Sequence, residues 1–207
     1  MTKIGAIILA AGMSSRMGEP KLLLLLKEKP LFRYSVELAI RLQLDPIVLI
    51  GGEYMDVFQS LTAEIDGIEF IKNKDYMDGM SSSLKLGIEK IKNRVDAVVI
   101  FLADQPFVPD FVVQSLIQDY KMERQKGIHI IRPQYNVNLG HPILIDRSLF
   151  SEFLNLEGDQ GGKEIIKKYK AKTKIRVFEP SFWGMDIDTA EDYKKANTIV
   201  NGKQRLF

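Results

Sequence analysis

The sequence alternates short apolar runs with longer segments in which apolar residues recur every three to four positions, and this order constrains the fold most strongly. Residues 4–9 and 96–102 are almost continuously hydrophobic, which is typical of strands buried on both faces of a parallel sheet. The segments 30–44 and 82–92 between them have helical spacing. Because neighbouring parallel strands need a crossover, the alternation predicts an α/β fold with right-handed connections.

The other predicted elements continue this order to about residue 132 and become less regular after it. Further strands are predicted at residues 46–50, 68–71, 128–131, 142–145, 175–178 and 185–187. Further helices are predicted at residues 54–65, 110–125, 147–156 and 163–169, and a last one opens at Thr189, where Asp192 is placed for a capping box. Since the sequence contains no repeat or linker, we expect one domain over residues 1–207.

Composition narrows the chemistry that the chain can perform. It has no cysteine and only two histidines, His129 and His141, so a thiol site, an iron–sulfur cluster or a multi-histidine metal site is excluded. A catalytic metal must be held mainly by oxygen, which points to a hard ion such as Mg²⁺. The net charge of +2 argues against a dedicated nucleic-acid binder. The apolar run at residues 4–11 is too short for a membrane span or a signal peptide, so we expect a cytoplasmic protein.

The loop after the first strand is a candidate nucleotide site, because ligands of open parallel sheets bind beyond the carboxyl ends of the strands. Ala10, Ala11 and Gly12 are small enough for close approach of a ligand, and the N–H groups of such a loop can point at phosphate oxygens. Arg16 and Lys21 add two cations to the same loop. A simple strand-to-helix turn would explain the small residues but not the spaced cations.

Carboxylates follow two other predicted strands. Asp104 follows the strand at 96–102, and Asp186 and Asp188 stand two positions apart near the last predicted strand. Aspartates from different strand ends can hold Mg²⁺ against a triphosphate. The alternative is that Asp188 helps to cap the last helix and that Asp186 is solvated.

Three consecutive hydroxyls, Ser81 to Ser83, precede a predicted helix. A hydroxyl at this place is a good N-cap, and a helix N-terminus with hydroxyls also suits a ribose or phosphate group. The two interpretations are compatible.

Six segments together resemble one family. LAAGMSSRMGEPKLLL at residues 9–24 resembles the signature of the MobA-like NTP transferases. Five more segments resemble the blocks of the molybdenum cofactor cytidylyltransferase branch: GMSSSLKLG at 79–87, LADQPFV at 102–108, RPQY…GHPIL at 132–144, GDQGGKEII at 158–166 and DIDTAEDY at 186–193. They span nearly the whole chain in the order of the family.

The resemblance implies a three-layer α/β/α, Rossmann-like nucleotidyltransferase fold with a mostly parallel sheet. It also implies a Mg²⁺-dependent reaction in which CMP is transferred from CTP to the phosphate of molybdenum-bound molybdopterin and pyrophosphate is released. The product serves xanthine-dehydrogenase-like enzymes, so an apo molybdenum hydroxylase is a candidate partner. The nucleotide-binding residues implied are Leu9, Ala10, Ala11, Gly12, Arg16, Lys21, Ser81, Ser82 and Asp104, of which Arg16, Lys21 and Asp104 are catalytic. The implied metal ligands are Asp104 and Asp188, with Asp186 as an addition, and the implied acceptor-binding residues are Gln105, Gly140, His141 and Pro142.

Several alternatives stay open. Ala11 and Gln105 favour CTP, but GTP with the same pterin, or an NTP with a sugar or alcohol phosphate, would use the same fold. A non-catalytic cofactor carrier or a regulatory nucleotide sensor is a different class of function. A lone histidine such as His141 is often structural. The basic segment 163–176, with seven cations and one acid, is either a solvated face or a surface that steers a polyanionic ligand.

Overall fold

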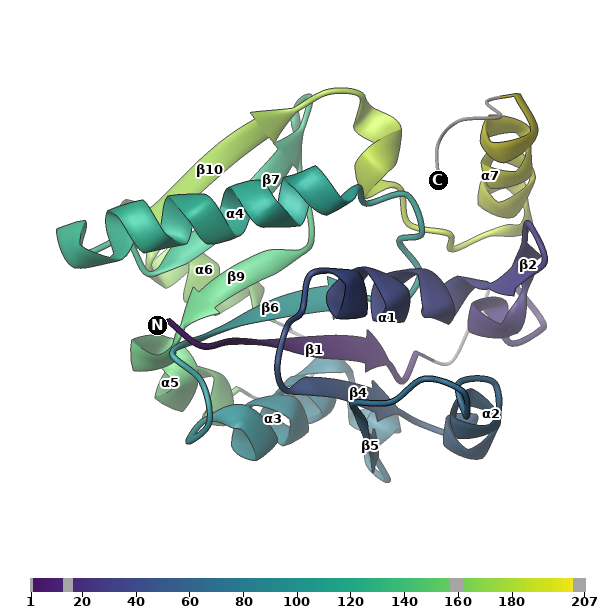
Figure 1. The fold of residues 1–207 in the computed structure, drawn as a ribbon, viewed down its shortest axis with the longest axis horizontal. Coiled ribbons are helices and arrows are strands. Elements are labelled where there is room, and N and C mark those ends of the chain that lie inside the picture. Colours follow the sequence, from purple (N-terminus) through teal and green to yellow (C-terminus); the bar gives the residue numbers. More distant parts are fainter. Residues whose placement is uncertain (1, 13–16, 157–161, 203–207) are drawn as a thin grey trace.

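The alternating pattern builds one large mixed sheet and a two-stranded ribbon in the computed structural model, which describes residues 2–12, 17–156 and 162–202 (Figure 1). The strands are β1 (Ile4–Ala10), β2 (Leu25–Leu26), β3 (Lys29–Pro30), β4 (Ile47–Gly51), β5 (Ile68–Lys72), β6 (Ala97–Leu102), β7 (Ile130–Tyr135), β8 (Asn138–Leu139), β9 (Ile143–Asp146) and β10 (Thr173–Phe178). The helices are α1 (Leu31–Arg41), α2 (Met55–Ser60), α3 (Met80–Ile91), α4 (Asp110–Glu123), α5 (Phe150–Leu154), α6 (Lys163–Lys168) and α7 (Ala190–Gly202).

The large sheet has the order β10-β7-β9-β6-β1-β4-β5, with β8 paired to β7. Strand β1 lies between β4 and β6 and is parallel to both, and β4 is parallel to β5. Strand β9 is antiparallel to β6 on one side and to β7 on the other, so β7 runs in the same direction as β6. The predicted mostly parallel sheet is confirmed, and β9 is the inserted strand that reverses.

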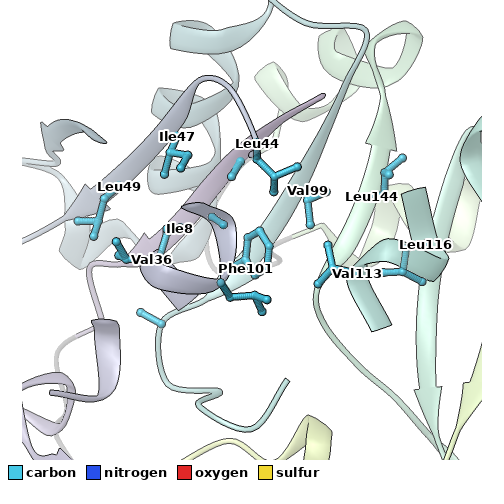
Figure 2. Close-up of a cluster of buried hydrophobic side chains, with 14 of the residues drawn as sticks. Ile8, Val36, Leu44, Ile47, Leu49, Val99, Phe101, Val113, Leu116 and Leu144 are labelled. Atoms are coloured by element: carbon cyan, nitrogen blue, oxygen red, sulfur yellow. The ribbon is translucent and has the colours of Figure 1, made fainter. Parts of the chain in front are cut away.

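Helices cover both faces of the sheet, which confirms the predicted three layers (Figure 1). Consecutive strand residues point to opposite faces, so Ile8 packs in the cluster formed with α1 and α4 whereas Ile7 packs in the cluster formed with α3 and α5. Figure 2 shows the first cluster, in which Val99 and Phe101 of β6 meet side chains of both covering helices. A third cluster joins α7 to α1 and contains Ile187. Within the described ranges, no helix has the length and apolarity needed to cross a membrane.

Most predicted elements are present, with differences at their ends. The helix predicted at 54–65 is confined to α2, because the hydroxyl of Thr62 donates to the carbonyl of Phe58 at 2.7 Å as the chain turns away. The segment predicted as helix at 147–156 is a 3₁₀ turn followed by α5. The predicted capping box is confirmed, since the Thr189 N–H donates to Asp192 Oδ2 at 3.0 Å and the Asp192 N–H donates to Thr189 Oγ1 at 3.2 Å.

Asp146 ties the reversed strand β9 to helix α4. Its Oδ2 accepts a 2.5 Å hydrogen bond from the Tyr120 hydroxyl, and its Oδ1 accepts one of 2.9 Å from the Ser148 N–H. Burial alone would raise the pKa of Asp146, but these hydrogen bonds outweigh it and the pKa lies below its ordinary value. A carboxyl group whose folded pKa is lowered stabilises the protein above its unfolded pKa and loses this contribution as pH falls through the folded pKa.

We therefore expect Asp146→Asn to lower the free energy of unfolding by about 1–3 kcal/mol at pH 7 and by less at pH 3.5. Urea unfolding at the two pH values measures the difference. Asp66→Asn, in an exposed loop, is the control and should change the free energy by less than about 0.5 kcal/mol. An equal loss from Asp146→Asn at both pH values would contradict the electrostatic origin of the effect.

Candidate active site

Several loops meet at one edge of the sheet. Strands β1, β6 and β7 run in the same direction and end at this edge, and β10 is parallel to β7 and ends there too. Because β9 runs the opposite way, its first residues lie at the same edge. The topology therefore gathers the segments that follow β1, β6 and β7 and the segment that precedes β9.

Lys21 joins two aspartates that are far away in the sequence. Its Nζ donates to Oδ2 of Asp104 at 2.5 Å and to Oδ1 of Asp188 at 2.7 Å, across 83 and 167 positions of the chain. Lys21 is only 8% exposed. A lysine is seldom buried to this extent unless it is paired, so this cluster is an organised site rather than a solvated surface pair.

The charge of Lys21 is fixed by its neighbours. Burial alone would lower the pKa of the Lys21 amine, but the charges and hydrogen bonds of Asp104 and Asp188 outweigh burial and raise the pKa above its ordinary value. The ammonium group is therefore charged throughout the neutral range, and it provides a positive charge at the edge of the sheet.

Asp186 is held on the other side of Asp104. Although Asp186 is exposed as a residue, its Oδ1 accepts a 2.7 Å hydrogen bond from Nε2 of the buried Gln105. Burial of the carboxyl group, followed by the negative charge of Asp104, raises the pKa of Asp186 to about 6. Asp186 is therefore exposed but also held by a hydrogen bond, and Asp188 pairs with Lys21 while Thr189 performs the capping.

The donor set fits a hard divalent cation that a ligand helps to hold. Oδ1 of Asp104 is buried and has no hydrogen-bond partner in the described part of the chain, which is costly for a carboxylate oxygen. Carboxylate oxygens are the ligands that Mg²⁺ prefers. Among residues 2–12, 17–156 and 162–202, however, no three acidic, histidine or cysteine side chains are grouped to hold a metal by themselves. Asp104 and Asp188 therefore suit an ion whose remaining ligands are oxygens of a bound molecule or of water.

The strand predicted at 185–187 is wrong. The segment is irregular and follows a 3₁₀ turn over Ser181–Gly184. It is attached beyond the end of β6, where the N–H of Ile187 donates to the carbonyl of Asp104 at 3.1 Å, and the Ile187 side chain is fully buried. Because Ile187 is anchored in this way, its two neighbours, Asp186 and Asp188, are held beside Asp104 although the segment is not a strand.

The small residues of the first loop lie where the sequence predicts. Leu9 and Ala10 end β1 in the middle of the sheet, Ala11 is buried, and Gly12 follows. A Cβ added to Gly12 would have no atom within 4 Å in the described structure, so packing against the protein does not require a glycine. Arg16 lies outside the described residues, and its role stays a prediction.

Two of the three serines have a structural use that the sequence did not reveal. The N-cap of α3 is Gly79, not a hydroxyl residue. Asn73, which directly follows β5, donates through Nδ2 to the hydroxyls of Ser82 at 2.8 Å and Ser83 at 2.9 Å. Ser81 is buried in the first turn of α3. Binding of a nucleotide by Ser81 and Ser82 stays a prediction.

The predicted acceptor residues are connected to the carboxylates through Tyr135, which the sequence did not single out. The Tyr135 hydroxyl donates to the carbonyl of His141 at 2.9 Å. Its ring lies close to two glycines. A Cβ added to Gly140 would come within 2.6 Å of the ring, and a Cβ added to Gly184 would come within 2.1 Å of it. Gln105 Nε2 in turn reaches the carbonyl of Gly184 at 3.4 Å. The place of Tyr135 in the family-like segment at 132–144 was the signal that could have found it.

His141 is neutral in this environment. Burial, followed by the positive charges of Arg132 and Lys163, lowers the pKa of His141 to about 4. Pro142, which follows it, is buried at the start of β9. The structure thus brings Gln105, Gly140, His141 and Pro142 to the same edge as the carboxylates.

Residues 6–173 match the MobA-like NTP transferase domain. This match extends over most of the chain and includes Lys21, Asp104 and His141. The chain belongs to the MobA-like NTP transferase family.

Two curated proteins and one solved structure are similar to this MobA-like NTP transferase. The purine catabolism protein PucB of Bacillus subtilis (strain 168) is 26% identical over 200 residues, covering 90% of this chain and 92% of that protein. The molybdenum cofactor cytidylyltransferase of Escherichia coli (strain K12) is 26% identical over 147 residues, covering 71% and 72%. A solved structure of Rv0371c from Mycobacterium tuberculosis H37Rv, in complex with manganese, is similar as well. Its TM-score is 0.79, its sequence is 24% identical, and the match covers 94% of this chain and 98% of that one, which shows a shared fold.

The basic segment 163–176 of this MobA-like NTP transferase is partly neutralised by the protein itself. Lys168 bonds Glu152 at 2.6 Å, and both Lys174 and Arg176 bond the buried Asp119, at 3.0 and 3.1 Å. These three cations hold β10 and α6 onto the body of the protein, so only part of the segment is left for the steering role.

Proposed function

We propose that this protein transfers CMP from CTP to the terminal phosphate of molybdopterin, with the molybdenum-bound form as acceptor, and that it does so in a single domain with Mg²⁺ as the metal. An acceptor oxygen attacks the α-phosphorus in line, and pyrophosphate leaves. The name of the Escherichia coli relative supports this reaction. The name of the Bacillus subtilis relative fits the same use of the product, because xanthine is a purine.

The observation that carries the proposal is the meeting of Lys21, Asp104 and Asp188 at the carboxyl edge of the sheet. Nζ of Lys21 lies 2.5 Å from Oδ2 of Asp104 and 2.7 Å from Oδ1 of Asp188. Phosphoryl transfer needs positioning and neutralisation of charge, and it needs no covalent intermediate on the protein. Lys21 supplies a permanent positive charge for the triphosphate. Ala10, Ala11 and Gly12 leave room for its phosphates beside β1.

A bound Mg²⁺ would neutralise the charge that develops on the phosphate oxygens, and Asp104 and Asp188, with Asp186 beside them, would hold it. Arg16, in the same loop as Lys21, is the second cation that we assign to the triphosphate. Gln105, Gly140, His141 and Pro142 would bind the acceptor, because they lie at the same edge and are joined to the carboxylates through Tyr135.

A thermal-shift panel with CTP, GTP, ATP and UTP, each with and without Mg²⁺, tests the proposal. A ligand at about 100 times its Kd adds roughly 2.7 kcal/mol to the unfolding free energy. In a chain of this size that corresponds to a rise in Tm of roughly 5–11 °C. We expect this rise for CTP in the presence of Mg²⁺.

Each other outcome has a definite meaning. A larger shift with GTP or ATP would overturn the choice of CTP and favour a guanylyltransferase or a sugar-phosphate enzyme of the same family. No shift with any nucleotide would favour a cofactor carrier, which binds the pterin without catalysis.

Gly12→Ala should leave the fold intact and raise the Kd for CTP about tenfold. The added methyl group enters space that no described atom occupies, so the apo Tm is expected to change little, whereas a phosphate close to the backbone would be displaced. Isothermal titration with CTP and Mg²⁺ gives the two Kd values. Gly202→Ala at the end of α7, where a Cβ also meets no atom within 4 Å, is the matched control. Equal CTP affinity in both variants would contradict the placement of the nucleotide beside Gly12.

A further inference from the structure

Arg132 on β7 is held unlike four other arginines of the described chain. Arg33, Arg41, Arg94 and Arg176 each form an ion pair with an aspartate or a glutamate. Within the described ranges Arg132 has no carboxylate partner, and its Nη2 makes only a long 3.4 Å hydrogen bond to the carbonyl of Gly140. Its Nε is buried without a hydrogen-bond partner there. A partly buried guanidinium with an N–H group that has no acceptor destabilises the folded protein unless a ligand accepts that hydrogen bond.

A second positive charge acts on the imidazole of His141. Lys163 is the exposed first residue of α6, and it forms no ion pair with any described residue. Its charge and that of Arg132 both act on His141 and, together with burial, keep that imidazole neutral. Neither cation forms an ion pair with a carboxylate of the described residues. Two positive charges that act on one neutral polar ring are complementary to a dianion.

This basic cluster is connected to the reacting edge by contacts. Gly140, whose carbonyl bonds Arg132, lies against the ring of Tyr135, and the same ring lies against Gly184. The carbonyl of Gly184 accepts from Gln105, the residue next to Asp104. The cluster is therefore connected to the carboxylates through Gln105.

We propose that Arg132 and Lys163 bind the phosphate monoester of the acceptor, with His141 as a further polar contact. The proposal rests on the proposed function and names the residues that orient the attacking group. A guanidinium presents a planar fork of donors that matches phosphate geometry, and the lysine adds a flexible point charge. Neither residue belonged to the acceptor set inferred from the sequence.

The test uses the side-chain Nε–H resonance of Arg132 in the full-length protein, assigned by its disappearance in Arg132→Lys. Inorganic phosphate is the probe, and the resonance reports binding at this site even if phosphate also enters the nucleotide site. We expect the resonance to shift with saturation in the wild type. Lys163→Gln, an exposed substitution that preserves the fold, should weaken the Kd read at Arg132 about tenfold.

Lys167→Gln is the matched control, because Lys167 is exposed on the same helix. It should change the Kd less than about twofold. Equal weakening by the two lysine variants would show general charge screening and overturn the proposal, as would a resonance of Arg132 that does not move during the titration. The nucleotide panel on the wild type separates the two proposals. If CTP raises the Tm but the Arg132 resonance does not move with phosphate, only this inference is overturned. If the Arg132 resonance moves but no nucleotide raises the Tm, the phosphate site is supported and the cytidylyltransferase function is overturned.

Discussion

Asp104→Asn should reduce kcat/KM for pyrophosphate release from CTP about 1000-fold, which is the upper range for the loss of one preorganised electrostatic contact. The substitution keeps the shape of the side chain and the backbone carbonyl that accepts from Ile187. It removes the negative charge of one of the two carboxylates that meet at Lys21 and replaces one of its two oxygens with an amide NH₂ group. The Mg²⁺-dependent part of the thermal shift with CTP should disappear in the same variant.

Asp110→Asn is the control for this experiment. Asp110 lies in the first turn of α4 and pairs with Arg41 at the surface, at 2.8 Å. Loss of an exposed pair should change stability by less than about 1 kcal/mol and leave turnover unchanged. If Asp104→Asn retained wild-type turnover while binding CTP, Asp104 would have no part in the chemistry.

Ile187→Ala should have the largest effect on stability, about 2–5 kcal/mol, because the side chain is fully buried in the cluster that joins α7 to α1. The same substitution loosens the irregular segment that holds Asp186 and Asp188 beside Asp104. We therefore expect a further loss, in which CTP with Mg²⁺ binds about tenfold more weakly at a temperature where the variant is folded. Urea unfolding gives the first quantity and isothermal titration the second.

Ile88→Ala separates these two effects. Ile88 is equally buried, but it belongs to α3 and packs in the cluster on the other face of the sheet. The variant should be destabilised to a similar degree and should bind CTP as the wild type does. If both variants bound CTP equally, the anchoring of the two aspartates by Ile187 would be disproved.

Local sequence patterns were sufficient for most elements of the fold. The continuous apolar runs that became β1 and β6 are visible in the sequence because both faces of these strands are covered. The capping box at Thr189 was also visible, since it depends on residues three positions apart. The segment at 185–187 was mistaken for a strand because its buried isoleucine follows the same apolar pattern, while its one bond to Asp104 is a tertiary contact.

The site shows the same division. Motif position indicated Lys21, Asp104 and Asp188 as candidates, and the structure brings the three side chains together. Their pairing through one ammonium group depends on which strand ends become neighbours. The serines of α3 were expected to cap the helix or to meet a ligand, whereas Asn73 from the end of β5 donates to two of their hydroxyls. Arg132 and Tyr135 stand in one of the family-like segments, but their contacts with Gly140 and His141 became visible only in the structure.

The sequence by itself determined the strand–helix alternation, the edge of the sheet at which a ligand is expected and the kinds of residue available there. These properties follow from hydrophobic periodicity and from the loops that it leaves, which are local along the chain. Only the tertiary structure decided which charges meet, because the order of the strands and the reversal of β9 bring together positions that are up to 167 residues apart. Coulombic and hydrogen-bond energies depend on distances in space, and sequence spacing does not record these distances.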